Sequence, residues 1–259
     1  MKSMVEETVI PHLQKNLLSE EVIKSRVLKT CGIGESTLEE KIEDIISQQS
    51  NPTIAPLASK AEVKLRLTAK AASEEEAERL ISTQQAELEE RIGKYIYGYD
   101  DDTLEKVIAK LLWRQDLKLA TAESCTGGLI GDRLTRIPGS SGYFERGVVS
   151  YSNQAKIELL GVKGTTLNQY GAVSKQTAQE MAIGIRKLAK TDIGLATTGI
   201  AGPDGGTDEK PVGLVYIAIA YNNGAEVYRY NFNGTRRQVK YLTSQVSLNL
   251  LRLKLLELK

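Results

Sequence analysis

The sequence has 259 residues, of which 41% are apolar, and a nearly balanced formal charge of +1. A chain of this length holds one large domain or two ordinary ones, and the composition is that of a soluble globular protein. No apolar run approaches the ~20 residues that a membrane helix needs, and the N-terminus is acidic where a signal peptide would be cationic. We therefore expect a cytoplasmic protein without a membrane partner.

Cysteine usage and charge distribution exclude several further classes. Cys31 and Cys125 lie far apart and neither belongs to a C-x-x-C pair, which argues against a disulfide framework and a structural zinc site. Residues 1–100 carry 13 Lys and Arg against 18 Asp and Glu, a net charge of −5, whereas residues 101–259 carry +6. The acidic first part argues against nucleic-acid binding there, and the basic second part suits an anionic small substrate.

The first part of the chain predicts a small α+β domain, which we place at residues 18–98. Strand-like runs are expected at 22–31, 52–58, 61–71 and 94–99, with amphipathic helices at 37–49 and 73–93. Ser36 with Glu39 and Ser73 with Glu76 have the spacing of capping boxes at the two helix starts. The resulting βαββαβ order fits a split-βαβ, ferredoxin-like sandwich. Residues 1–17 fit neither part of the chain and read as a leftover helix.

Residues 101–259 predict a three-layer α/β domain, because helical patterns alternate with buried apolar strands. Helices are expected at 101–116, 129–137, 176–190 and from Arg236 onward. Strands are expected at the start of 116–128 and of 192–202, each running into a turn or loop, and a hairpin at 213–221 with 226–232.

The stretch AESCTGG at 122–128 places two candidate nucleophiles, Ser124 and Cys125, in a turn between a strand and a helix. Backbone N–H groups at the start of that helix would favour an anion or a developing oxyanion, and Gly127 and Gly128 would let a ligand approach closely. The alternative is structural: Ser124 or Thr126 caps the helix and the glycines form the turn.

The base that would activate a nucleophile cannot be a histidine of this domain. The single histidine, His12, lies near the N-terminus, so a lysine, a carboxylate or a tyrosine remains. Burial lowers the pKa of a lysine and supplies a neutral amine that can accept the serine proton. The sequence YSNQAK puts Tyr151 at a strand end and Lys156 in the first turns of a helix, although an ordinary exposed lysine is the alternative.

A glycine-rich loop, TTGIAGPDGGTDEKPVG at 197–213, follows an apolar strand. It places Thr198, Gly199 and Asp204 near the carboxyl end of that strand, where open α/β sheets bind ligands. A plain connection is the alternative, but long loops in compact domains are usually functional or disordered. We favour a binding loop.

Five motifs in this order resemble the C-terminal domain of the CinA family, the nicotinamide mononucleotide amidohydrolase also called PncC. They are AESCTGG, GSSGYFERGVVSYSNQAK, YGAVS, TTGIAGPDGG and KPVG, and the resemblance covers essentially all of residues 101–259. Residues 18–98 are similar to the KH-like middle domain of longer CinA proteins, although GIGES at 32–36 is not the G-x-x-G clamp of RNA-binding KH loops. Residues 1–17 resemble the last helix of the molybdopterin-binding-like domain that precedes it, so we expect the chain to lack that domain.

The resemblance implies hydrolysis of nicotinamide mononucleotide to nicotinate mononucleotide and ammonia in pyridine nucleotide recycling, without metal or cofactor. Ser124 corresponds to the nucleophile, Lys156 to the general base and Tyr151 to a supporting hydroxyl. Substrate-binding residues are expected at Glu123, Thr126, Gly127, Gly128, Thr198, Gly199, Asp204 and Arg236. We also expect a homo-oligomer.

One stretch departs from the family pattern. NGTRRQVK at 233–240 has Thr235 and Lys240 where relatives carry Asp and Arg, so phosphate contacts near residue 240 are left open. Two other functions are also left open. One is a noncatalytic nucleotide-binding module that uses the same glycine-rich loops, and the other is a partner-binding adaptor that acts through residues 18–98.

Overall fold

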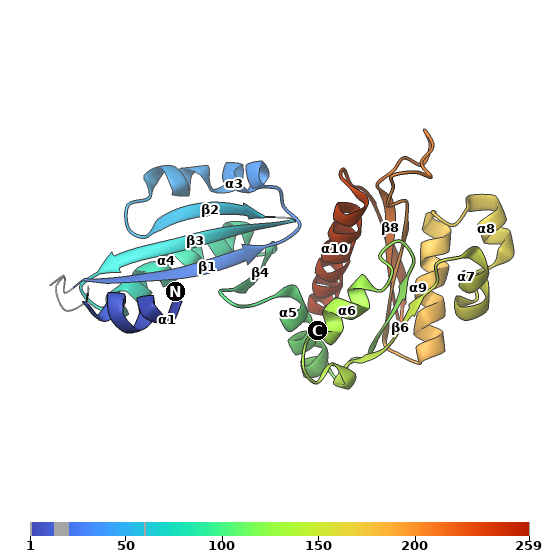
Figure 1. Cartoon of the computed structure of the whole chain (residues 1–259), viewed down its shortest axis with the longest axis horizontal. Coiled ribbons are helices and arrows are strands. Elements are labelled where there is room, and N and C mark those ends of the chain that lie inside the picture. Colours follow the sequence, from blue (N-terminus) through green and yellow to red (C-terminus); the bar gives the residue numbers. More distant parts are fainter. Residues whose placement is uncertain (1, 13–20, 60, 259) are drawn as a thin grey trace. The chain divides into compact units, whose positions relative to one another are not determined.

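The computed structural model describes residues 2–12, 21–59 and 61–258, which form two compact units, Met1–Asp100 and Asp101–Lys259 (Figure 1). Residues 2–12 are helical, beginning with α1 (Lys2–Met4), and residues 3–12 are exposed. The part of the leftover helix expected at 13–17 lies outside the described residues. Among the helices that are described, none has the length and apolar character needed to cross a membrane.

The first unit contains a four-stranded antiparallel sheet with the order β2-β3-β1-β4. Its elements are β1 (Val22–Thr30), α3 (Glu35–Gln48), β2 (Thr53–Ser59), β3 (Glu62–Ala71), α4 (Glu74–Ile92) and β4 (Ile96–Tyr99). Alternate residues of β3, among them Leu65 and Leu67, are fully buried in a core with Leu38 of α3 and Ile81 of α4. The predicted βαββαβ sandwich is therefore confirmed.

The two predicted capping boxes have different outcomes. The Ser73 hydroxyl accepts a hydrogen bond from the Glu76 N–H at 3.2 Å, but the Glu76 carboxylate accepts from the N–H of Ala72, so half of the box forms. The prediction for Ser36 is wrong. Helix α3 begins at Glu35 with extended Gly34 as its N-cap, whose carbonyl accepts the first helical bond, from Leu38, and Ser36 therefore lies inside the helix. There is no side-chain cap because the N-cap residue, glycine, has no side chain.

The second unit is a three-layer α/β domain around a five-stranded sheet with the order β6-β5-β7-β8-β9. Figure 1 shows α5, α6 and α10 on one face of this sheet and α7, α8 and α9 on the other. The strands are β5 (Leu119–Glu123), β6 (Phe144–Val149), β7 (Ile193–Gly199), β8 (Leu214–Tyr221) and β9 (Gly224–Asn231). The helices are α5 (Leu104–Gln115), α6 (Leu129–Thr135), α7 (Asn153–Leu160), α8 (Gly164–Tyr170), α9 (Lys175–Ala189) and α10 (Arg236–Glu257). The predicted layers and hairpin are confirmed, whereas α8 was not predicted.

Strand β5 leads directly to the stretch at 122–128 that contains the candidate nucleophiles, and it lies at the centre of the parallel part of the sheet. It pairs in parallel with β6 on one side and β7 on the other, and all five of its residues are buried. Buried parallel strands read as continuous apolar runs, which is why the pattern at 119–122 was informative. Since parallel strands end at the same edge, the segments after Glu123, Val149 and Gly199 meet there.

Candidate active site

Ser124 and Lys156 meet at the carboxyl edge of the second sheet. Ser124 directly follows β5 and is fixed by a bond from its N–H to the Thr197 carbonyl of β7. Lys156 lies in the first turns of α7, and its Nζ lies 3.1 Å from the Ser124 Oγ. This distance is within the range expected between a nucleophile and its base.

Lys156 is held in an almost completely buried position. Its side chain is 1% exposed, and Nζ also donates to the carbonyls of Ser150 at 2.9 Å and Tyr151 at 3.2 Å. The Ser152 hydroxyl caps α7 by accepting from the N–H of Ala155, which turns the first helical turn back toward the end of β6. Burial disfavours the ammonium and lowers the pKa of Lys156.

Cys125, the second candidate nucleophile, points into the core. It is 5% exposed, and desolvation raises the pKa of its thiol to about 12. A thiol of this kind is protonated at neutral pH, and only the thiolate is a strong nucleophile.

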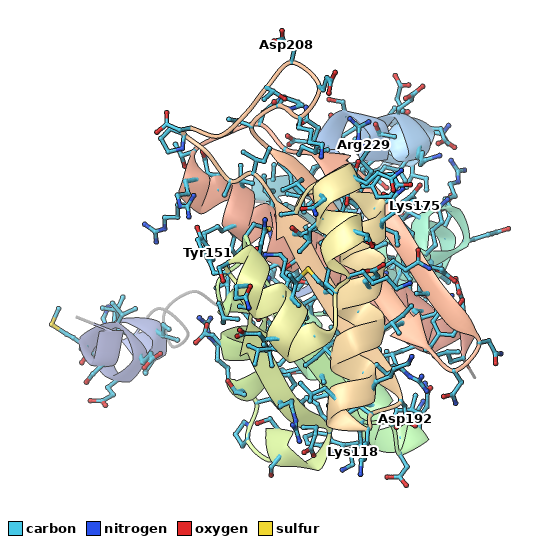
Figure 2. All side chains as sticks on the ribbon, turned by 90° about the vertical axis from the view of Figure 1, so that its right-hand side faces the viewer. Lys118, Tyr151, Lys175, Asp192, Asp208 and Arg229 are labelled. Atoms are coloured by element: carbon cyan, nitrogen blue, oxygen red, sulfur yellow. The ribbon has the colours of Figure 1, made fainter. Side chains whose placement is uncertain are left out.

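Tyr151 and Arg236 form an exposed pair beside this dyad. The Tyr151 side chain is 61% exposed (Figure 2), and its hydroxyl accepts a hydrogen bond from Arg236 at 2.7 Å. A second Arg236 nitrogen donates to the carbonyl of Gly202 in the glycine-rich loop. Lys156 contacts the Tyr151 carbonyl and Arg236 contacts its hydroxyl, so the tyrosine connects the lysine to the first turn of α10.

Glu123 has a different environment from the one expected of a substrate-binding residue. Its side chain is buried, and the carboxylate accepts N–H bonds from Gly128 at 3.0 Å, Ile130 at 3.1 Å and Gly131 at 2.8 Å. The helix N-terminus predicted to attract an anion thus already holds an anion from the protein itself. The carboxylate caps α6, because the free amides and the dipole at a helix N-terminus favour negative charge.

Three other expected binding residues already make contacts within the protein. The Thr126 hydroxyl is bonded to that of Thr197 at 2.8 Å, and the Thr198 hydroxyl donates to the Ala172 carbonyl at 2.8 Å, so both are already used. At Gly199 a Cβ atom would come within 2.7 Å of the Leu214 carbonyl oxygen, so the backbone packs too closely for a side chain.

Asp204 lies away from the dyad. It is exposed in the 197–213 loop, whose Asp208 projects from the unit in Figure 2, and it is not among the residues that line the two site cavities. Its role in substrate binding stays a prediction, and in this structure the acidic residues of the loop, Asp204, Asp208 and Glu209, are exposed.

Two cavities flank the turn at 124–128 and share Arg236. The smaller, about 200 Å³, is lined by Ser124, Cys125, Tyr151, Lys156, Ala172, Val173, Thr198, Gly199, Ala201 and Arg236. The larger, about 760 Å³, is lined by Thr126, Gly127, Gly128, Leu129, Asp132, Arg236, Arg237, Lys240 and Tyr241. The Lys240 ammonium lies 3.3 Å from the position that a Cβ of Gly127 would take, so the larger cavity carries positive charge directly above the glycine turn.

Several of these residues were not predicted from the sequence. Asp132 and Tyr241 belong to no quoted motif, and Arg237 lies within NGTRRQVK at 233–240 but was not singled out there. Thr235 caps α10 through a reciprocal box with Gln238, so this departure from the family pattern keeps a helix cap of the kind an Asp would provide.

Within residues 2–12, 21–59 and 61–258, no group of three His, Cys, Asp or Glu side chains is arranged to hold a metal ion.

Comparisons with known proteins identify both parts of the chain. Residues 25–98 match the damage-inducible protein CinA KH domain, and residues 101–255 match the CinA C-terminal domain. A relative from Acetivibrio thermocellus named for competence-damage induction is 51% identical over all 259 residues, which cover 62% of its length, and a CinA-like protein from Kosmotoga olearia is 46% identical over 258 residues, or 62% of its length.

Solved structures agree with these matches. A CinA superfamily protein from Klebsiella pneumoniae is 36% identical with a TM-score of 0.58, over 60% of this chain and 96% of that one. A competence/damage inducible protein from Agrobacterium tumefaciens is 43% identical with a TM-score of 0.55, over 57% of this chain and 91% of that one. The chain thus spans about 62% of the length of the curated relatives it matches, and it belongs to the CinA family.

Proposed function

We propose that the second unit is a nicotinamide mononucleotide deamidase that uses Ser124 as nucleophile and Lys156 as general base. The observation that carries this proposal is the buried Lys156 Nζ at 3.1 Å from the Ser124 Oγ. A lysine whose pKa is lowered by burial supplies a neutral amine in the place that histidine takes in other serine hydrolases. Membership of the CinA family is compatible with an amidohydrolase.

The reaction follows from the chemistry of a carboxamide. The Ser124 oxygen attacks the carboxamide carbon while its proton passes to Lys156, which forms a tetrahedral intermediate and an ammonium. The ammonium then returns the proton to the leaving nitrogen, so ammonia departs and an acyl ester of Ser124 remains. A water molecule attacks the ester with Lys156 again as base, which releases the carboxylate and restores the serine.

The oxyanion of each tetrahedral intermediate needs fixed hydrogen-bond donors. We assign this task to backbone amides of the turn that follows Ser124, since the amides further along, at Gly128, Ile130 and Gly131, already bond to Glu123. Glu123 would then act on catalysis only indirectly, by fixing the turn.

The larger cavity supports a substrate that carries a phosphate. Arg236, Arg237 and Lys240 line it together with the backbone of Gly127 and Gly128, and Arg236 also lines the smaller cavity at Ser124. A mononucleotide whose pyridine carboxamide reaches Ser124 would extend its ribose phosphate toward these cations, which suit an anionic phosphate. In this chain Lys240 would supply the charge that relatives are expected to supply with an arginine.

Ammonia release from nicotinamide mononucleotide by the purified chain tests the proposal. The Ser124→Ala chain should bind the nucleotide but release no ammonia, whereas Cys125→Ala should retain most of the activity. Nicotinamide, which lacks the ribose phosphate, should be a poor substrate. A wild-type chain that binds the nucleotide without turnover would favour the noncatalytic module, and loss of activity in Cys125→Ala but not in Ser124→Ala would end the assignment of the nucleophile.

A further inference from the structure

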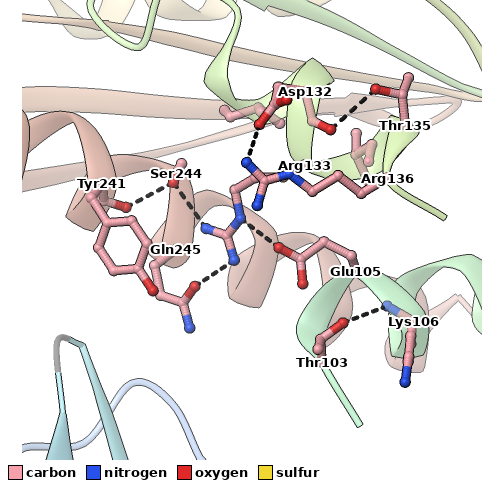
Figure 3. Close-up of polar contacts among 12 residues, drawn as sticks. Thr103, Glu105, Lys106, Asp132, Arg133, Thr135, Arg136, Tyr241, Ser244 and Gln245 are labelled. Carbon is pink, nitrogen blue, oxygen red and sulfur yellow. Dashed lines mark hydrogen bonds and ion pairs between the residues drawn. The ribbon is translucent and has the colours of Figure 1, made fainter. Parts of the chain in front are cut away.

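A buried arginine outside the proposed catalytic dyad joins three helices of the second unit. Arg133 of α6 is 6% exposed, and its Nε donates to the Glu105 carboxylate of α5 at 2.5 Å. Its two terminal nitrogens donate to the Ser244 hydroxyl at 2.9 Å and to the Gln245 side-chain oxygen at 2.6 Å, both on α10 (Figure 3). The planar guanidinium is thus bonded on all sides by fixed partners.

Burying this pair of charged side chains costs free energy, so its presence in the core needs an explanation. Removing an arginine and a carboxylate from water costs several kcal/mol per ion in effective terms, and apolar side chains of similar volume are often as stable or more stable. Desolvation raises the pKa of Glu105, but the charge of Arg133 together with hydrogen bonds to the carboxylate more than offsets it, so the pKa lies below its ordinary value. Buried charged networks of this kind can fix one particular arrangement of the elements they join.

The elements joined here are the two walls of the larger cavity. One wall is the turn at 126–129 and Asp132, which directly precedes Arg133 on α6. The other is the first part of α10, from Arg236 to Tyr241. Ser244 and Gln245 lie one helical turn after Lys240 and Tyr241, on the same side of the helix.

Tyr241 makes the link to the cavity direct. The carbon of the Arg133 guanidinium lies 5.6 Å from the centre of the Tyr241 ring, and this ring also lines the cavity. The Tyr241 carbonyl in turn accepts the hydroxyl of Ser244, which itself accepts from Arg133 (Figure 3). A shift of the guanidinium would therefore move the cavity wall and the cations next to it.

We infer that Arg133 is a positioning residue, which sets the separation between the glycine turn at 126–129 and the cationic start of α10 and thereby determines how tightly the anionic part of the substrate is bound. This inference rests on the proposed function for its kinetic consequence. Its structural content, the fixed distance between the two walls, does not depend on the reaction.

The test variant is Arg133→Lys, which keeps a cation beside Glu105 but cannot bond to three partners in one plane or stack on Tyr241 in the same way. We expect KM for nicotinamide mononucleotide to rise about tenfold or more while kcat changes by less than about threefold, because substrate binding and not the chemical step is affected. Hydrogen exchange of the amides at 126–129 and 236–241 should become faster in the variant.

Two further variants make the test decisive. If Arg133→Lys does not fold, the double variant Arg133→Met with Glu105→Met removes both charges, leaves no unpaired ion, and should show the same rise in KM. The matched control is Arg252→Met, which removes a different buried arginine, one that lies on α10. It should leave KM unchanged even if it lowers the melting temperature.

An unchanged KM and unchanged exchange in both segments of a folded Arg133 variant would overturn the inference, as would an equal rise in KM in Arg252→Met. A wild-type chain that releases no ammonia would instead end the proposed function. Hydrogen exchange would then decide the inference alone, since faster exchange at 126–129 and 236–241 supports it and unchanged exchange refutes it.

Discussion

The buried carboxylate of Glu123 should be worth several kcal/mol to the second unit. It accepts three backbone N–H bonds at 2.8–3.1 Å at the start of α6. In Glu123→Gln the amide oxygen can take the position of Oε2 and keep the bonds from Gly128 and Ile130, but the new NH2 group then faces the N–H of Gly131. One bond to a charged acceptor is lost, at ~1.5–3 kcal/mol, the N–H of Gly131 is left without an acceptor, and the two bonds that remain are weaker because their acceptor is neutral. Relief from burying a charge offsets part of this loss, so we expect the free energy of unfolding to fall by about 2–4 kcal/mol.

The chain offers a specific probe for this measurement. Its single tryptophan, Trp113, lies on α5 of the second unit with its ring edge-on to Tyr143 at 5.3 Å between centroids. Urea unfolding followed by tryptophan fluorescence therefore reports on this unit. Glu158→Gln, on the exposed side of α7, is the matched control and should change stability by less than about 0.5 kcal/mol. A loss below about 1 kcal/mol in Glu123→Gln would refute the cap as an important interaction.

The remaining predictions concern Lys156 and Tyr151. Lys156→Arg should lower turnover by several orders of magnitude without preventing nucleotide binding, because a guanidinium does not deprotonate in this range; near-normal turnover would show that Lys156 is not the base. In the wild type, kcat/KM should rise with pH through the lowered pKa of Lys156. A pKa lowered by burial makes the folded protein release a proton that the unfolded chain retains. The stability cost is therefore full below the lowered pKa and disappears as pH rises to 10.5. Lys156→Met removes this cost but also the two bonds from Nζ to the Ser150 and Tyr151 carbonyls, which are lost at every pH. The melting temperature of Lys156→Met relative to the wild type should therefore be higher at neutral pH than near pH 10, and a pH-independent difference would contradict this account. Tyr151→Phe should cost less turnover than Lys156→Arg, and the reverse order would make tyrosinate the more plausible base.

The sequence by itself determined the elements and their layers. The strand-like runs that became β3 and β5 were predicted from their local residue patterns, and β5 is buried along its whole length although it includes Thr121 and Glu123. The helix cap at Ser73 could also be predicted from the sequence, because its donor and acceptor lie only three residues apart. The choice of Ser124 and Lys156 came from a resemblance together with the lack of a histidine in this part of the chain.

Only the tertiary structure decided what these side chains contact. Ser124 and Lys156 are 32 residues apart and meet because β5 lies between β6 and β7, a strand order that no local pattern encodes. Three of the free amides predicted after Ser124 are occupied by Glu123, because the turn brings the N–H groups of Gly128, Ile130 and Gly131 to its carboxylate. Arg133 meets partners 111 and 112 residues away on α10, although its place between Ile130 and Leu134 on the buried side of α6 was a signal that a charge lies in the core. Such contacts depend on how whole helices pack, and spacing along the chain carries little information about that.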